Sequence, residues 1–342
     1  MTRTAGAQIG CQRPSRFWGL GCPKIFHEAE DTLVPEHLEQ EVELTKGYLA
    51  EQHAPSTRRA YRADWKIFEA WCEQKEISPL PARPETVAMF LSSEADQGKS
   101  PATLRRRLAA IRLAHRMADL ESPTNSELVK GTFAGIRRVH GTVPNAKEPA
   151  IAERIRAMVD PIDRDTPAGA RDRALLLFGF SGAFRRSELV SIQVDDLERK
   201  EQGLIVSIRK SKTDQEGVGD TVPIIQADHY CPIQALDHWL KLSAIESGPI
   251  FRRVYKGGKV GTTVLSAYSV ALIVKKWATQ AGLKADDFAG HSLRSGFLTS
   301  AAMNRASLFK MMEVSRHKDP KTVMQYIKKS ELFDDHAGEG LL

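Results

Sequence analysis

A tyrosine near the end of the chain lies in a strongly basic stretch. Residues 316–329 read RHKDPKTVMQYIKK, and Tyr326 is preceded by His317 and by Asp319-Pro320. Asp-Pro predicts a helix N-cap followed by proline at the first helical position, which puts Tyr326 less than two turns into that helix. Tyrosine is often a core residue with a polar tip. Here its near neighbours are cations, which suits a place that holds a negatively charged group.

Three further segments in the same half of the chain hold reactive residue types. In SGAFRRSEL, Arg185 and Glu188 are three apart and share a helix face. In GHSLRSG, His291 and Arg294 have the same spacing at a predicted helix start. RKSKTD, residues 209–214, forms the basic tip of a predicted hairpin. Taken singly, each segment is more simply explained as a surface ion pair, a helix end or a solvated loop.

The composition limits the classes of protein to which the chain can belong. Its 342 residues favour two domains, and a hydrophobic fraction of 42% is enough for real cores. A net charge of +6 suits a polyanionic partner such as DNA without proving one. The four cysteines form no C-x-x-C pair, which favours free thiols in a reducing compartment over a metal site.

The sequence lacks the signals of export and of membrane insertion. No apolar run reaches the length of a membrane span, and the N-terminus has no apolar segment of the kind found in signal peptides. We therefore expect a cytoplasmic protein with no membrane partner, or a nuclear protein if the host is eukaryotic.

The first part of the chain has helical periodicity. Residues 1–31 are rich in Gly, Arg and Pro and are expected to form a flexible arm. Residues 32–140 predict an all-helical domain. Its expected helices begin at Ser56 as N-cap, at Pro84, near Ser100-Pro101 and at about Pro123, the last of them ending at His140.

The third of these helices is rich in arginine. One side carries apolar residues and His115, and the other sides carry Arg105, Arg106, Arg112 and Arg116. A run of charges is usually a solvated helix face. This run has almost no acidic partners four residues away, which weakens that explanation. The four arginines are therefore candidate DNA-binding residues.

The character of the sequence changes after residue 140. Residues 141–150, GTVPNAKEPA, have the composition of an exposed linker. Residues 151–342 predict a second domain with a buried helix at 171–180, strands at 204–209 and 221–225, and helices from 232, 266 and 291. The expected fold class is mainly α, with a small antiparallel β-sheet in the C-terminal domain.

The order of the reactive segments is more specific than any one of them. R-x-S-E-L, a hairpin K-T, H-x-L-R, and then a histidine followed by a tyrosine occur in one order. This set resembles the tyrosine recombinase (phage integrase) family over nearly the whole chain. The resemblance implies a two-domain architecture, in which residues 32–140 are a core-binding, DNA-binding domain and residues 151–342 are the catalytic domain.

The resemblance also implies a catalytic set. Its members are Arg185, Glu188, Lys212, His291, Arg294, His317 and Tyr326. Lys212 precedes Thr213 and fits the family pattern better than Lys210, which lies at the same hairpin tip. Arg185 fits better than Arg186 because it stands three residues before the glutamate. The tyrosine would be the nucleophile that forms a covalent 3′-phosphotyrosine with DNA.

The other members would support that attack. Arg185 and Arg294 would clamp the phosphate, because a guanidinium donates two bonds and stays ionised. By the same resemblance, His291 would accept the tyrosine's proton and Lys212 would protonate the leaving 5′-oxygen. His317 would donate a hydrogen bond to the phosphate, and Glu188 would orient a catalytic side chain. No metal, ATP or other cofactor is expected.

The partners implied are double-stranded DNA with a specific recombination site and further copies of the chain. In the family, four subunits join two duplexes and pass through a Holliday junction, with the C-terminal segment packed on a neighbour. Leu332 and Phe333 could pack in this way, and packing on their own chain is equally compatible with the sequence. A bacterial, phage or plasmid origin would follow.

Two alternatives differ in activity. A type IB topoisomerase shares the same residue logic but relaxes supercoils as a monomer, and the two-domain layout and short tail after Tyr326 favour the recombinase. A helical DNA-binding protein without catalysis would be the other alternative. It is disfavoured because every expected catalytic residue type is present.

Overall fold

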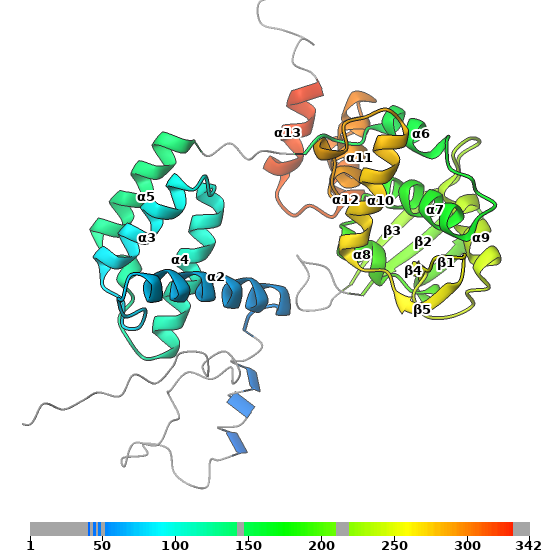
Figure 1. Ribbon diagram of the computed structural model, residues 1–342. Coiled ribbons are helices and arrows are strands. Elements are labelled where there is room, and N and C mark those ends of the chain that lie inside the picture. Colours follow the sequence, from blue (N-terminus) through cyan, green and yellow to red (C-terminus); the bar gives the residue numbers. More distant parts are fainter. Residues whose placement is uncertain are drawn as a thin grey trace, which may run out of the picture. The chain divides into compact units, whose positions relative to one another are not determined.

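The chain folds into two compact units. The computed structural model describes residues 40–41, 44–45, 47–48, 52–141, 147–209 and 219–330. The units are Met1–Pro144 and Asn145–Leu342 (Figure 1). The predicted arm at 1–31 and the tail after residue 330 lie outside the described residues.

The first unit consists of packed helices in its described part, as the periodicity predicts. Its elements are α2 (Pro55–Gln74), α3 (Pro84–Asp96), α4 (Pro101–Met117), the 3-10 helix η4 (Pro123–Asn125) and α5 (Glu127–His140). Their apolar faces meet in one core that contains Trp65, Phe68, Phe90 and Ile111. The rings of Phe68 and Phe90 are 5.0 Å apart and meet edge to face, a favoured aromatic geometry.

The helix starts follow local signals, with two exceptions. Ser100 caps α4, because its hydroxyl accepts from the Thr103 N–H over 3.3 Å. The prediction that Ser56 caps α2 is wrong, since the cap is Ala54 and Pro55 begins the helix. Proline has a preset φ and no N–H, so it suits the first helical position, and the helix starts two residues earlier than predicted. The predicted helix from Pro123 is split into η4 and α5.

His115 lies on the buried face of α4, and both of its ring nitrogens have hydrogen-bond partners. Its Nε2 accepts from the Ala82 N–H over 2.9 Å, and its Nδ1 lies 2.9 Å from the Ile111 carbonyl oxygen, to which it donates. This pair of bonds requires the neutral ring, because a protonated Nε2 could not accept. Burial lowers the pKa of His115, and the bond to Ile111 offsets only part of that effect.

Acidification is expected to destabilise the first unit. Well above the ordinary histidine pKa of about 6.5, His115 is neutral both folded and unfolded, and stability does not depend on its protonation. Below that pH the unfolded chain takes up a proton that the folded unit refuses, so the unfolding free energy falls by up to about 1.4 kcal/mol per pH unit. Hydrogen exchange of the amides in α2–α5 would measure this. His115→Gln should lose that slope, whereas exposed His140→Gln should keep it.

The second unit is built around α7 (Figure 1). Its elements are α6 (Ala152–Val159), α7 (Pro167–Ser181), α8 (Arg186–Ser191), η5 (Val194–Asp196), β1 (Leu197–Lys200), β2 (Gly203–Ile208), β3 (Asp220–Ile225), α9 (Pro232–Ser243), β4 (Arg252–Val254), β5 (Val260–Val264), α10 (Ala267–Gln280), η6 (Ala285–Asp287), α11 (Ser292–Met303), α12 (Leu308–Ser315) and α13 (Pro320–Ser330). Ten of the 15 residues of α7 are buried and none is exposed, which explains the almost continuous apolar run in its sequence.

The sheets are antiparallel and small. The larger has the order β1-β2-β3, with Val206 opposite Leu197 on one side and Val222 on the other. Alternate residues of β2 point into the core, as expected for a strand with one buried face. The predicted fold class is confirmed. A second sheet, β4-β5, was not predicted because three- and five-residue strands are too short to show alternation.

Three helices at the C-terminal end form their own apolar cluster. Leu298, Ala302, Met311 and Val323 from α11, α12 and α13 are buried together, and Tyr326 packs against them. The Asp319 carboxylate accepts from the Lys321 N–H over 2.9 Å, so the predicted cap of α13 is confirmed. This cluster therefore holds the helix that carries the tyrosine.

Residues 147–150 belong to the second unit. The Ala150 N–H donates to the Ser292 carbonyl over 2.9 Å, and the Glu148 N–H donates to the Asp287 carbonyl over 2.7 Å. Gly296 in α11 permits this contact, because a Cβ placed there would lie 2.0 Å from the Ala150 carbonyl oxygen. Residues 142–146 of the predicted linker lie outside the described part.

Gly296→Ala is expected to lower the unfolding free energy of the second unit. A methyl group there would push against backbone rather than a flexible side chain, and overpacking of this kind costs about 1–3 kcal/mol. Denaturant unfolding would measure the change. Gly131→Ala is the matched control in α5, where no atom lies within 4 Å of the added Cβ. It should be stabilising by about 0.5–1 kcal/mol, and equal effects of both variants would contradict the packing argument.

No helix among the described residues is long and apolar enough to cross a membrane. Over the same residues, no three His, Cys, Asp or Glu side chains are grouped so that they could hold a metal ion.

Candidate active site

Arg185 and Glu188 meet at the start of α8. The Arg185 Nη1 donates to Glu188 Oε1 over 2.5 Å, and the Arg185 backbone N–H donates to Oε2 over 2.9 Å. Burial by itself would raise the pKa of Glu188, but the charge of Arg316 and the bonds and charge of Arg185 outweigh it and lower that pKa. The carboxylate is therefore ionised at neutral pH and holds Arg185 in one orientation.

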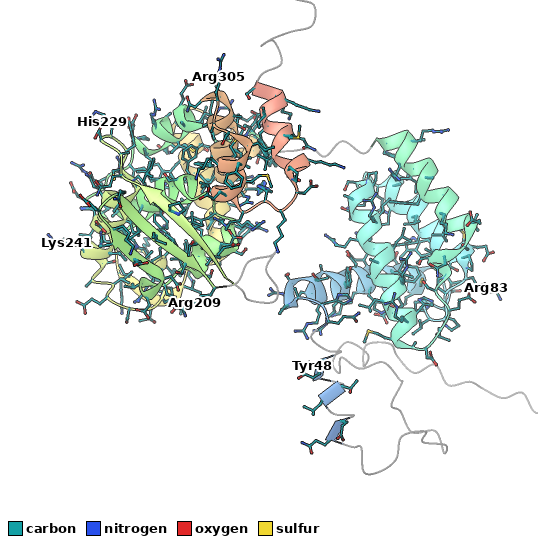
Figure 2. All side chains as sticks on the ribbon, turned by 180° about the vertical axis from the view of Figure 1, so that it is seen from behind. Tyr48, Arg83, Arg209, His229, Lys241 and Arg305 are labelled. Atoms are coloured by element: carbon teal, nitrogen blue, oxygen red, sulfur yellow. The ribbon has the colours of Figure 1, made fainter. Side chains whose placement is uncertain are left out.

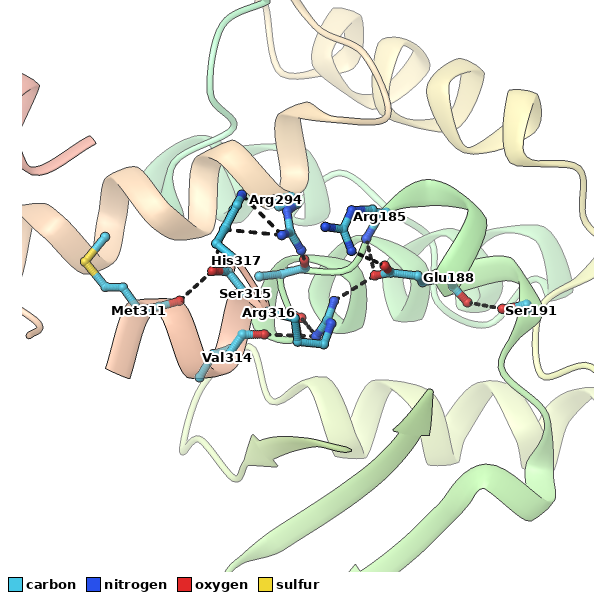
Figure 3. A network of polar contacts seen from close by, with 11 residues as sticks. Arg185, Glu188, Ser191, Arg294, Met311, Val314, Ser315, Arg316 and His317 are labelled. Carbon is cyan, nitrogen blue, oxygen red and sulfur yellow. Dashed lines mark hydrogen bonds and ion pairs between the residues drawn. The ribbon is translucent and has the colours of Figure 1, made fainter. Parts of the chain in front are cut away.

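Arg294 is almost completely buried in α11. Its Nη1 donates to the Ala183 carbonyl over 2.7 Å, and its Nη2 lies 3.3 Å from both ring nitrogens of His317 (Figure 3). Burial, followed by the like charges of Arg185 and Arg316, lowers the pKa of Arg294 to about 9. The guanidinium stays charged at neutral pH, and the backbone contact keeps it from turning away from the site.

His317 lies between Arg294 and Ser315. The Ser315 hydroxyl gives its one hydrogen to the Met311 carbonyl over 2.6 Å, so it must accept from His317 Nδ1, which lies 2.7 Å away. The Nε2 of His317 then carries the lone pair that faces Arg294. Burial and the surrounding positive charges, first that of Arg294, lower the pKa of His317 to about 4. The ring is therefore neutral at physiological pH.

The charge of Arg294 also acts on His291 and on Tyr326. His291 precedes α11 and is exposed on one side. The protein around the rest of its ring, and then the charges of Arg294 and Arg185, lower its pKa, so the imidazole is neutral and able to accept a proton at neutral pH.

Tyr326 is half-buried on α13. Burial raises the pKa of Tyr326, and Arg294 offsets only part of that effect. The cationic setting suggested by the basic sequence is thus limited, because the lysines that follow in α13 are exposed. Ionisation of the phenol requires a proton acceptor.

Arg316 also belongs to this cluster, although its sequence position marks it only as one of several basic neighbours of Tyr326. Its Nη2 donates to Glu188 Oε2 over 2.7 Å, so Glu188 is bonded to arginines on both sides (Figure 3). No spacing rule links residues 188 and 316, since the pairing depends on how α8 and α12 pack. The only signal in the sequence was that a carboxylate has two acceptor oxygens, which leaves room for a second partner besides Arg185.

Other predicted site residues lie elsewhere. Lys212 and Lys210 fall outside the described residues. The four arginines predicted to bind DNA are in the first unit, and three of them have other contacts there. Arg106 forms a two-point ion pair with buried Asp64, at 2.6 and 3.0 Å, and Arg112 donates to Thr124 over 3.0 Å. The Arg105 guanidinium lies over the Phe133 ring at 6.0 Å. Arg116 is exposed at the end of α4.

Comparison with known proteins identifies the family. Residues 151–332 match the phage integrase family, and residues 46–121 match the phage integrase N-terminal SAM-like domain. The chain is 40% identical over 297 residues to the integrase/recombinase xerD homolog of Selenomonas ruminantium, which covers 85% of this chain and 87% of the relative. It is 24% identical over 283 residues to the recombinase Cre of Escherichia phage P1, and the match covers 77% of this chain and 81% of Cre.

The fold agrees with that assignment. XerH site-specific recombinase bound to palindromic difH substrate, in a post-cleavage complex, matches with a TM-score of 0.62 at 15% identity and covers 93% of this chain and 92% of its own. The fold and the sequence relatives define a tyrosine recombinase, a DNA strand transferase. The chain belongs to the phage integrase family, and the resemblance predicted from its ordered motifs is confirmed.

Proposed function

We propose that the protein cleaves and rejoins DNA at a specific recombination site through a covalent 3′-phosphotyrosine at Tyr326. The observation that carries the proposal is the convergence of Arg185, Arg294 and His317, which come from three separate elements. The half-buried tyrosine lies within reach of the Arg294 charge.

The transferred phosphate needs its charge held in place. In-line attack by the Tyr326 oxygen loads charge onto the non-bridging oxygens, and Arg185 and Arg294 donate to them. His291 accepts the phenolic proton, because its lowered pKa keeps it neutral. Lys212 protonates the leaving 5′-oxygen. The phosphotyrosine conserves the phosphodiester bond energy, so a 5′-hydroxyl can reverse the step without ATP.

His317 would change its bonding when DNA binds. In the observed arrangement its Nε2 accepts from Arg294, so it has no proton there to donate to a phosphate. An anionic phosphate would draw the Arg294 Nη2 toward itself and favour the protonated ring, which can donate. The role expected from the sequence therefore requires either uptake of a proton or movement of the ring.

The first unit would bind DNA as the core-binding domain of residues 32–140. Arg116, Arg112 and Arg105 are exposed on α4 and could reach phosphates. Arg106 is the weaker candidate, because freeing it would leave the Asp64 carboxylate, which is 1% exposed, with a poorer partner. We further propose that four subunits assemble on two duplexes, that the tail after α13 packs on a neighbour, and that the protein acts in the cytoplasm of a bacterial host.

Covalent trapping tests the proposal. The purified protein would be mixed in EDTA with supercoiled plasmids that carry the DNA flanking its gene and with a library of random duplexes, then quenched with SDS. We expect a protein–DNA adduct and exchanged strands between plasmids. Relaxed plasmid without exchanged strands would instead favour a type IB topoisomerase. Duplexes that are bound but never form an adduct would favour a binding protein without catalysis.

A further inference from the structure

Arg316 has a backbone conformation that is unusual for its residue type. It follows α12 with φ 56° and ψ 41°, in the left-handed region that favours glycine. Arg305 shares this φ but is exposed, so the backbone alone does not distinguish Arg316. The Arg316 side chain is only 3% exposed.

The Arg316 side chain joins two segments that carry site residues. Its Nη1 donates to the Val314 carbonyl over 2.9 Å and lies 3.3 Å from the Gly182 carbonyl oxygen. Its guanidinium is 5.4 Å from the centre of the Phe184 ring. Gly182 and Phe184 precede Arg185, and Val314 lies three residues before His317. Arg316 thus connects the loop before Arg185 with the turn that carries His317.

Glu188 transmits the effect of Arg316 to Arg185. One carboxylate oxygen bonds the Arg185 side chain, while the other bonds the Arg185 backbone N–H and the Arg316 Nη2. Figure 3 shows Glu188 between the two guanidinium groups. Because Arg316 bonds one side of the Glu188 carboxylate, it fixes the orientation of that carboxylate. The fixed carboxylate in turn holds Arg185 on its other side.

We propose that Arg316 is a positioning residue which, through Glu188, sets the orientation of the Arg185 guanidinium for the phosphate. The inference rests on the proposed role of Arg185 at the scissile phosphate. Arg316 is assigned a positioning role because its side chain is only 3% exposed and its terminal nitrogens bond Glu188, Val314 and Gly182, while its Nε is buried without a hydrogen-bond partner.

The proposal predicts a pH effect that a packing role would not produce. Glu188 faces Arg185 at the start of its own helix, Arg316 after α12, and the charge of Arg294 from α11. Without the Arg316 charge, the pKa of Glu188 rises. Cleavage needs the ionised carboxylate, so activity should then be lost at a higher pH as the solution is acidified.

Three variants test the proposal on a nicked duplex made from a sequence that the trapping assay recovers. Arg316→Gly removes the side chain and suits the left-handed backbone, so the change adds no backbone strain. Arg316→Lys keeps the charge but cannot make the same set of bonds. Arg305→Gly is the matched control, because Arg305 is also at φ 56° and is exposed at the end of α11 (Figure 2).

Single-turnover cleavage would be followed from acid to alkaline pH, and the pKa of Glu188 would be measured by carbon NMR, with Glu188→Gln to assign the signal. We expect Arg316→Gly to cleave about 10- to 100-fold more slowly near neutral pH. In the plot of cleavage rate against pH, the acid limb, where the rate falls on acidification, should move to higher pH. Arg316→Lys should be intermediate and keep an acid limb near that of wild type. Arg305→Gly should stay within about twofold of wild type in rate.

The outcomes separate this inference from the proposed function. An unchanged Glu188 pKa in Arg316→Gly, or a cleavage rate equal to that of wild type, would overturn the positioning role. If wild type forms no adduct with any duplex, the proposed function fails. The NMR titration would still decide whether Arg316 controls Glu188.

Discussion

Tyr326→Phe is expected to abolish the covalent adduct and all strand exchange. The change removes one oxygen, and that oxygen is the proposed nucleophile. Phenylalanine keeps the ring that packs against the cluster of α11, α12 and α13, so the fold should be retained. DNA affinity should change little, because most of it comes from phosphate contacts made by other residues. Adduct formation on an SDS gel and binding by gel shift measure the two properties separately.

A matched tyrosine provides the control for this experiment. Tyr230→Phe also removes one hydroxyl, which donates to Asp160 over 2.8 Å. This hydroxyl lies near the beginning of α7, whereas Arg185 follows the end of that helix. Its adduct yield should equal that of wild type. An adduct that survives Tyr326→Phe would exclude this residue as the nucleophile, and loss in both variants would point to a general effect on folding.

Arg294→Lys is expected to lower the cleavage rate by about a hundred- to a thousandfold, although the positive charge is nominally retained. The guanidinium reaches the Ala183 carbonyl and His317 with different nitrogens, and one ammonium group cannot do both and also bond a phosphate. Gel-shift affinity for the duplex should stay near that of wild type. The loss should therefore appear in the rate at saturating DNA.

The pH dependence of this variant gives a second test. The site already lowers the pKa of Arg294 to about 9 through burial and the neighbouring arginines. Lysine starts from an ordinary pKa about two units below that of arginine, so it would be partly neutral near physiological pH. The deficit relative to wild type should thus be smaller at about pH 6 than at about pH 8.5. Exposed Arg305→Lys is the control and should show no such trend. A deficit that does not vary with pH would contradict the electrostatic account.

The elements and the motif order could be predicted from the sequence. Helices α4, α9, α10 and α13 begin where serine or proline signals place them. The hairpin strands β2 and β3 followed from alternation. The errors occurred where local signals compete, as at Ser56, or where strands are too short for a pattern, as in β4 and β5.

The family and most candidate site residues follow from the sequence, because both depend on residue types in a fixed order. Only the tertiary structure decided that Glu188 binds two arginines, that Arg106 is paired with Asp64, and that Arg316 is buried beside the site. These contacts join residues 42 to 128 positions apart, and which pairs meet depends on the packing of separate helices. The pKa values of His317 and Arg294 were likewise beyond sequence reasoning, since burial and the distances between charges set them.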